Sequence, residues 1–79
     1  MPSKTISKFD EAVIDIIAEK RRFMNMSQSE FAFALGTTPG FIGQIEAKKR
    51  KYNINHLNKI ARVFKCSPCD LLPKEIIED

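Results

Sequence analysis

The 79-residue sequence has no tryptophan, one tyrosine, three glycines and no long hydrophobic run. No stretch approaches the ~18 apolar residues of a membrane-spanning helix, and the chain does not open on a charged and then apolar leader. Two cysteines without such a leader are typical of a reducing, intracellular setting. We therefore expect a cytoplasmic protein that does not enter a membrane.

Residue sets for catalysis or metal binding are also sparse. No Ser/His/Asp set and no glycine-rich phosphate loop is recognisable, so we expect no enzyme activity and no cofactor. Cys66-Ser-Pro-Cys69 has the spacing of a redox or zinc motif. A structural zinc site needs four ligands, however, and the chain offers two cysteines and the single His56. We favour packing for the cysteines and a capping or surface role for His56, with no metal.

The most informative segment runs from residue 26 to residue 46 and predicts two short helices joined by a glycine turn. Ser27 and Glu30 have the spacing of a capping box, which starts a helix. Gly36 supplies the left-handed residue that ends it. Thr38-Pro39 then gives an N-cap and a proline at the first helical position of the next helix. Two helices around such a turn are the pattern of a DNA-reading helix-turn-helix.

Three further helices are indicated, which makes the predicted fold all-α with five helices. The first starts at the Ser7 capping box, the fourth at Asn53, and the short fifth at Ser67, cut by Pro73. We expect a frayed N-terminus (1–6), one domain (7–73) and an acidic tail (74–79). The expected core residues outside the two central helices are Phe9, Val13, Ile16, Ile17, Met24, Met26, Leu57, Ile60, Ala61, Phe64, Leu71 and Leu72.

Positive charge is concentrated in two short runs. The net charge is +3, and the tail carries −2, so the rest of the chain carries +5. One run is residues 20–22 and the other is residues 48–51, directly after the second helix of the central pair. A run of this kind is usually a solvated loop, but here it lies where a nucleic-acid backbone would pass. We therefore expect this loop to contact phosphates.

From Ile17 to about Leu72 the chain resembles the phage-repressor-like (XRE, Cro/repressor-type) helix-turn-helix family. This resemblance implies a domain that binds double-stranded DNA through a recognition helix in the major groove, as a small transcriptional regulator. The matching positions are Arg21, Ser27-Gln28, Phe31-Ala32, Leu35-Gly36, Ile42, Ile45-Glu46, Leu57, Ile60-Ala61, Phe64 and Leu71.

The resemblance also implies which residues read base edges, and this chain departs from the family there. Only Gln44 carries an amide that can pair with adenine, whereas Thr38 and Phe41 offer a methyl or a ring to thymine. Either the glycines bring the helix close to the groove, or specificity comes from dimer spacing and other segments. The expected base-reading residues are Thr38, Gly40, Phe41, Gly43 and Gln44.

Five residues are expected at phosphates: Gln28, Lys48, Lys49, Lys51 and Tyr52. Gln28 stands at a helix start, where free N–H groups favour an anion, but it could also be a plain exposed residue. Tyr52 could equally pack against the fourth helix. Lys48 occupies a loop position where the family often has glycine, which leaves the turn geometry open.

The resemblance also implies a contact within the chain and a contact between two copies of it. The family commonly joins the positions of Arg21 and Glu46 by a structural ion pair, and we expect the same here. Helix-turn-helix domains commonly bind as two-fold dimers, and the candidate surface is the apolar set Leu71, Leu72, Ile76 and Ile77. The alternative function is a protein-interaction module, such as the antitoxin-like subunit of a toxin–antitoxin pair, with a toxin as partner.

Overall fold

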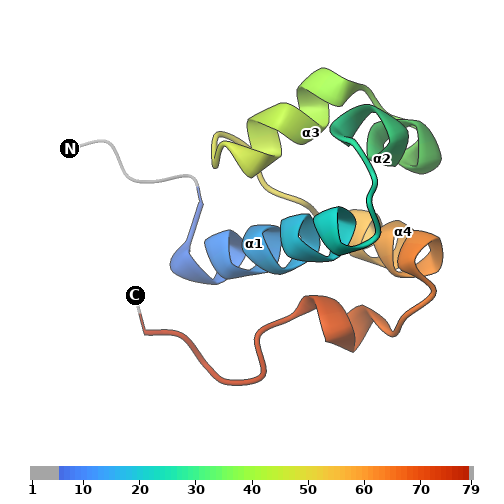
Figure 1. Cartoon of the computed structure of the whole chain (residues 1–79). Coiled ribbons are helices and arrows are strands. Elements are labelled where there is room, and N and C mark those ends of the chain that lie inside the picture. The colour runs from blue at the N-terminus through green and yellow to red at the C-terminus, as the bar shows by residue number, and fades with distance from the viewer. Residues whose placement is uncertain (1–5, 79) are drawn as a thin grey trace.

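The computed structural model of the protein describes residues 6–78 and contains four α-helices and one 3-10 turn (Figure 1). Helices α2 and α3 lie on one side of α1, and the turn and the chain after it lie on the other side (Figure 1). None of the described helices is long and apolar enough to cross a membrane. The elements are α1 (Lys8–Phe23), α2 (Gln28–Leu35), α3 (Pro39–Glu46), α4 (Ile54–Phe64) and the 3-10 turn η1 (Pro68–Leu71).

Every helix begins at an N-cap that the sequence predicts. Ser7, Ser27, Asn53 and Ser67 take part in reciprocal capping boxes, and the Thr38 side chain accepts the N–H of Phe41. These caps satisfy N–H groups that have no partner within the helix. The all-α class is therefore confirmed.

The fifth helix is reduced to the single turn η1. Leu72 is extended, at φ −113° and ψ 148°, because the residue before a proline is disfavoured in the α region. Pro73 itself has no N–H to donate to the preceding turn. The count of five helices is therefore wrong by one: the short segment between the two prolines cannot continue as an α-helix.

Four residues with left-handed backbone shape the connections. Gly36 ends α2 at φ 73°, as predicted, at no steric cost. Asn25, Lys48 and Lys65 adopt the same region at φ 58°, 67° and 56°. For the two lysines this conformation costs about 1–2 kcal/mol each. Lys48 thus adopts the left-handed conformation that glycine favours, although it is a lysine.

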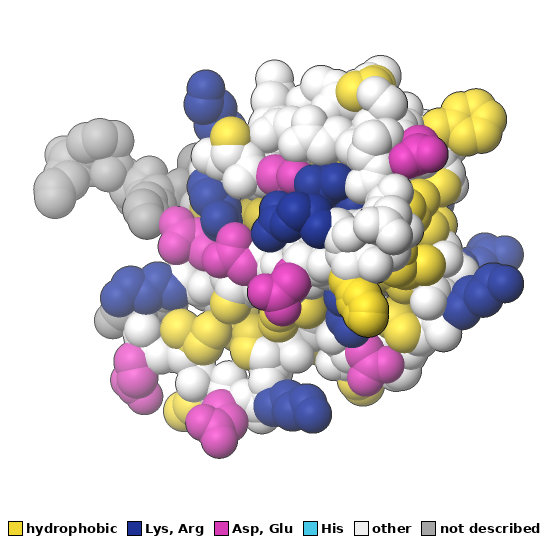
Figure 2. All heavy atoms as spheres, in the orientation of Figure 1, with side chains coloured by type: hydrophobic (Ala, Val, Ile, Leu, Met, Phe, Trp, Pro, Cys, Tyr) yellow, Lys and Arg dark blue, Asp and Glu magenta, His cyan; other side chains and the backbone are white. Residues whose placement is uncertain are grey.

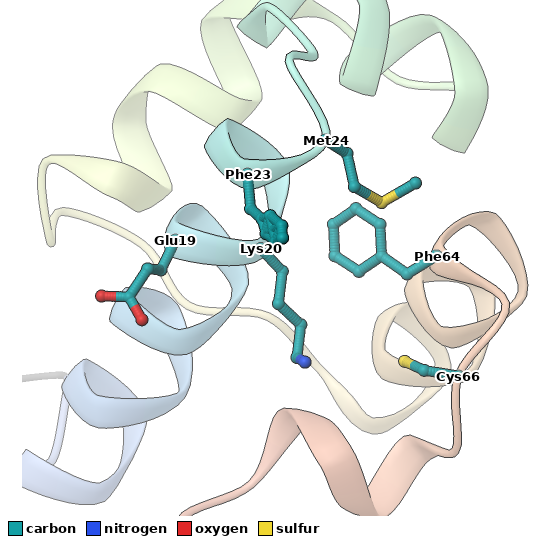
Figure 3. Close-up of a pocket in the computed structure, with 6 residues that line it drawn as sticks. All are labelled: Glu19, Lys20, Phe23, Met24, Phe64 and Cys66. Atoms are coloured by element: carbon teal, nitrogen blue, oxygen red, sulfur yellow. The ribbon is translucent and has the colours of Figure 1, made fainter.

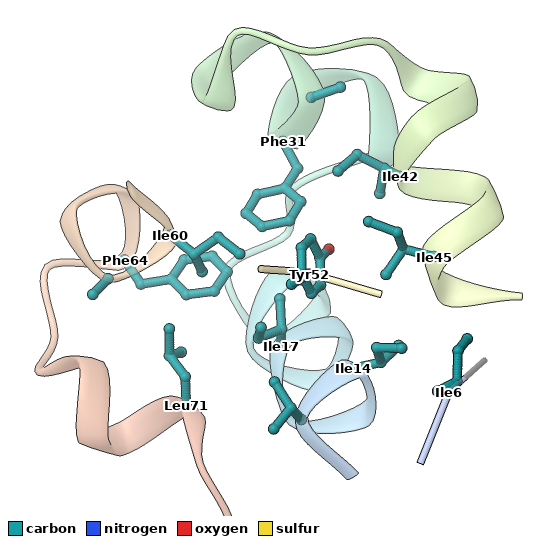
Figure 4. Packing of buried hydrophobic residues seen from close by; sticks show 13 residues of the cluster. Ile6, Ile14, Ile17, Phe31, Ile42, Ile45, Tyr52, Ile60, Phe64 and Leu71 are labelled. Atoms are coloured by element: carbon teal, nitrogen blue, oxygen red, sulfur yellow. The ribbon is translucent and has the colours of Figure 1, made fainter. Parts of the chain in front are cut away.

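The core forms where all four helices and η1 converge (Figure 4). The rings of Phe31 in α2 and Phe64 in α4 stack with centroids 5.3 Å apart. This stack joins α2 to α4. The largest fully buried side chains are Ile14, Ile17, Phe31, Ile42, Ile45, Ile60 and Leu71.

Three predictions about burial need correction. Ile14 is only 1 % exposed, whereas Phe9 is 38 % exposed. The reason is that the buried stripe of α1 begins at Val13 rather than in the first turn of the helix. Met24 is 48 % exposed at the end of α1 rather than in the core. The segment predicted to be frayed covers residues 1–5, which lie outside the described residues, and Ile6, whose side chain is buried with only 3 % of the residue exposed.

Candidate nucleic-acid interface

The pair α2 and α3 presents one face of α3 to the core and the opposite face to solvent. Ile42 and Ile45 are fully buried, and they are one turn apart, which fixes the rotation of the helix about its axis. The exposed face carries Gly40 and Gln44, with Gly43 half-buried beside them. This exposed face of α3 is the surface that could enter a groove of a nucleic acid.

The five expected base-reading residues do not all reach that face. Gln44 is exposed, and Thr38 is exposed but uses its hydroxyl to accept the N–H of Phe41 at 3.2 Å. A Cβ placed on Gly40 would meet nothing within 4 Å, and one on Gly43 would meet only Oε1 of Gln28, at 3.6 Å. Neither glycine is therefore required by contacts within the described chain.

Phe41 is directed toward α4 rather than toward solvent. Its ring centroid lies 5.3 Å from that of His56, and the guanidinium of Arg50 lies 4.9 Å from the ring centroid. The ring is half-buried in this contact. Phe41 therefore joins α3 to the first turn of α4, and the cation–π contact with Arg50 stabilises this joint. The thymine contact expected of this ring stays a prediction.

Two side chains expected at phosphates, Gln28 and Tyr52, are held within the protein: one is hydrogen-bonded and the other is buried. Nε2 of Gln28 donates to Oε1 of Glu46 at 2.9 Å. Tyr52 is only 7 % exposed, and its hydroxyl is buried without a hydrogen-bond partner among the described residues. Burial raises the pKa of this phenol, and the negative charge of Glu46 adds to the effect. In this structure Tyr52 packs in the core, and its buried hydroxyl does not face solvent, where a phosphate would lie.

The basic loop at residues 48–51 is partly neutralised by α1. Nζ of Lys48 lies 2.7 Å from Oδ1 of Asp15, and Nζ of Lys51 lies 3.9 Å from Oδ2 of Asp10. Acidic and basic side chains are interleaved between α1 and α3 (Figure 2). Lys49 is exposed and has no partner among the described residues. Of the three expected lysines, Lys49 is therefore the one fully available to a phosphate.

Arg21 and Glu46 join the end of α1 to the end of α3. Nε of Arg21 donates to Oε2 of Glu46 at 2.9 Å, and Nη2 donates to Oε1 at 3.1 Å. The side chains are 10 % and 12 % exposed, and Arg21 also donates to the carbonyl of Met26. Burial tends to raise the pKa of Glu46, but the hydrogen bonds from Arg21 and Gln28 outweigh it and lower the pKa. This two-point contact orients α3 without occupying its exposed face.

The Cys-x-x-Cys segment is divided between the core and the surface. Cys66 packs partly against the core, Cys69 is exposed, and both are free thiols. His56 accepts the N–H of Asn53 through Nδ1 at 3.0 Å, which completes the cap of α4. Among residues 6–78, no three His, Cys, Asp or Glu side chains are grouped to hold a metal.

Comparison with known proteins points to one family. The sequence model of the helix-turn-helix family HTH_3 matches residues 17–71. No curated protein sequence matches the chain.

Several solved structures share the fold. The restriction-modification controller protein C.AhdI from Aeromonas hydrophila is 23 % identical at a TM-score of 0.71, over 80 % of this chain and 93 % of that one. An HTH_3 family transcriptional regulator from Vibrio cholerae is 24 % identical, also at 0.71, over 80 % of this chain and 35 % of that one. Hydroxypropylphosphonic acid epoxidase from S. wedmorenis is 24 % identical at 0.73, over 90 % of this chain. This chain spans only 36 % of that epoxidase, and identities this low establish the fold alone.

Proposed function

The chain belongs to the helix-turn-helix family HTH_3, whose sequence model covers residues 17–71, and on this premise we propose that it binds double-stranded DNA sequence-specifically. The recognition element is α3, which lies in the major groove, and the protein acts as a small transcriptional regulator. It is a binding protein and not an enzyme.

One observation carries this proposal: the solvent face of α3 is open and has no structural role in the described chain. Glycine inside a helix costs about 0.5–1 kcal/mol relative to alanine, and α3 contains two. Gly40 meets open space, and Gly43 has only an ordinary contact with Gln28. Since packing within the chain does not explain them, close approach to a groove is the better reason. The major groove is wide enough to admit an α-helix.

The chemistry around α3 supports the same proposal. Gln44 is an exposed amide that can pair with adenine through two hydrogen bonds. Lys49 follows the helix and is free for a phosphate, where it fixes position but not sequence. Arg21 and Glu46 hold the helix at a fixed angle. Reading by shape and close backbone approach supplements the single amide.

The test is selection of bound duplexes from a random DNA pool, followed by affinity measurements with two variants. Gln44→Ala is expected to relax preference at one position of the site, by about 1–3 kcal/mol. Lys49→Ala is expected to weaken binding to all sequences alike and to reduce the salt slope by about one unit. Lys65→Ala, with the same charge change at the far end of α4, is the matched control. A pool without enriched sequences, or no binding at low salt, contradicts the proposal.

A second candidate is the protein-interaction module, such as an antitoxin-like subunit. Phe33 and Phe23 are 88 % and 78 % exposed, and apolar side chains that are exposed as a contiguous patch mark partner surfaces. Phe23 and Met24 also line a surface pocket together with Phe64 and Cys66 (Figure 3). The two functions are compatible in one protein. A double variant, Phe23→Ser and Phe33→Ser, that still binds selected DNA but no longer neutralises a co-expressed toxin would support this function, whereas intact neutralisation would contradict it.

A further inference from the structure

A second surface of the molecule, here called the α2–α4 groove, is a hollow between the C-terminal ends of α2 and α4. In Figure 1 these two helix ends lie at the right of the view, whereas α3 ends and the basic loop begins at the left. No residue of the exposed face of α3 lines the groove. The residues that carry the argument are Phe33, Leu35, Lys59, Arg62 and Val63.

The apolar half of the groove comes from both helices. The ring of Phe33 is 88 % exposed, while Leu35 and Val63 are half-buried where they pack against the core. Phe33 therefore projects beside a shallow apolar floor that the fold leaves uncovered. A phenylalanine this exposed adds little to the packing of the core, and apolar side chains that face water together mark an interaction surface.

The polar half of the groove is positively charged throughout. Lys59 and Arg62 are exposed one turn apart on α4, so their side chains stand on the same side of the helix. No Asp or Glu is among the described residues that line the groove, and neither cation has an ion pair within residues 6–78. Glu30 of α2 accepts the N–H of Ser27 at the other end of that helix. Both charges are therefore available to a partner.

The two halves lie side by side on one edge of the molecule. Figure 2 shows hydrophobic side chains at the right of the view, with Lys and Arg side chains next to them. An apolar side chain of a partner fits against Phe33 and the floor of the groove. Carboxylates of the same partner fit beside Lys59 and Arg62, and a guanidinium can bind a carboxylate through two parallel hydrogen bonds.

This combination favours one kind of occupant, a peptide segment in which acidic residues flank a large apolar one. Such a segment matches the groove in charge as well as in apolar character. A nucleic-acid backbone would match the two cations but not the apolar floor. A lipid surface would meet the projecting ring of Phe33 but would not fill the hollow beside it.

We propose that the α2–α4 groove binds an acidic, amphipathic segment of a partner protein. Phe33 contacts the apolar residue of that segment, and Lys59 and Arg62 bind its carboxylates. The site goes beyond DNA binding, because it uses no residue of α3, and it specifies a partner chemistry whether or not the partner is a toxin. It is separate from the C-terminal set expected to pair two copies, of which Leu71 is fully buried; that pairing stays a prediction.

The test selects ligands for the full chain from a displayed library of random peptides of about twelve residues, which are long enough for three helical turns. Enriched peptides should combine Asp or Glu with Leu, Phe or Trp. A synthetic copy of the strongest peptide then gives a dissociation constant by fluorescence anisotropy. A second copy, with each carboxylate replaced by its amide, should bind at least about tenfold more weakly.

Two matched pairs of variants locate the site. Phe33→Ser and Phe23→Ser each remove a phenylalanine ring, and these residues are 88 % and 78 % exposed, so circular dichroism should show the native fold in both. Lys59→Glu and Lys74→Glu reverse the same charge on exposed residues of α4 and of the C-terminal segment. Phe33→Ser and Lys59→Glu should each weaken peptide binding about tenfold or more, whereas the other two variants should leave it unchanged.

A library without enriched acidic peptides overturns the proposal, as does peptide binding that Phe33→Ser and Lys59→Glu leave intact or that only the control variants weaken. Vesicles of phosphatidylglycerol and duplexes of unselected sequence are titrated as well. Binding to either that depends on Phe33, and that no selected peptide displaces, overturns the proposal in favour of lipid or nucleic acid. Selected DNA should bind Phe33→Ser as it binds the wild type. A chain that binds acidic peptides but no DNA contradicts the proposed function alone.

Discussion

The carboxylate of Glu46 connects three helices. It accepts hydrogen bonds from both Arg21 and Gln28, so one carboxylate joins the end of α3 to α1 and to the start of α2. Removing one partner of a buried ion pair leaves the other charge without compensation. Glu46 therefore links stability to the orientation of the recognition helix.

We predict that Glu46→Ala lowers the free energy of unfolding by about 3–5 kcal/mol, because it leaves the Arg21 guanidinium buried without its partner. Urea denaturation would measure the loss. The double variant Arg21→Met with Glu46→Leu is the control, since an apolar pair of similar size should cost less than the single change. If the single change costs less than about 1 kcal/mol, or if the double variant costs more, the pair does not have this role.

Single residues also show where sequence reasoning stopped. The sequence does not reveal that Gln28 contacts Glu46, 18 positions away, or that Lys48 contacts Asp15, 33 positions away. The position of Tyr52 after a basic run leaves open whether it contacts a phosphate or packs on the fourth helix, and its burial depends on contacts that form only in the fold. Pairings across the fold decide which of several polar side chains remain free, and no local pattern contains them.

At the scale of elements, local chemistry was sufficient for the helices. A polar N-cap followed by apolar spacing located all four starts, because caps and periodicity act within a few residues. The same logic overestimated η1, where Pro73 ends the segment before a helical turn can close. It also misplaced part of the buried stripe of α1. Val13 and Ile17 are buried as predicted, but Ile14 completes the stripe in place of Ile16, which stands two positions further and therefore on a different side of the helix.

The composition of α3 leads to a prediction about stability and function together. Gly40→Ala and Gly43→Ala should each raise the free energy of unfolding by about 0.5–1 kcal/mol. Neither glycine has a positive φ, and a methyl group meets nothing closer than 3.6 Å. The same changes should weaken binding to selected DNA, because the methyl groups occupy the space between helix and groove.

Thermal unfolding and DNA titration of the same samples would separate the two effects. Gly36→Ala is the contrasting control: Gly36 has φ 73°, so a side chain there should destabilise the protein. Stabilised variants that bind DNA as tightly as the wild type would remove close approach of α3 as the reason for its glycines.

For the molecule as a whole, acid should reduce stability in two separate ranges. Burial and the charges of Lys59 and Arg50 lower the pKa of His56 from 6.5. The unfolded chain therefore takes up the proton first, and stability falls as pH drops below about 6.5 toward the lowered value. The pKa of Glu46 is lowered from 4.5, so its contribution is present above 4.5 and is lost as pH falls further.

His56 is the single histidine, so the first range can be assigned to it. His56→Gln keeps an acceptor at the third helical position for the capping box and should remove the decline that begins as pH drops below 6.5, while leaving the decline below pH 4.5. Urea denaturation from about pH 3 to 7.5 would cover both declines. A decline of the same size in the variant would assign the first range to another group.

The interleaved charges between α1 and the basic loop set how strongly the whole molecule is attracted to DNA. Lys48 is held by Asp15 at 2.7 Å, so a phosphate must compete with a carboxylate of the protein for it. Asp15→Asn should free this lysine and raise DNA affinity by up to about fivefold, because a surface ion pair contributes about 1 kcal/mol. It should also steepen the salt slope by about one unit.

The control is Glu19→Gln, which makes the same change in net charge. Glu19 is an exposed residue on the same helix without an ion pair among the described residues. If both variants bind alike across a salt series, net charge alone governs the attraction and the contact of Lys48 with Asp15 has no part in it.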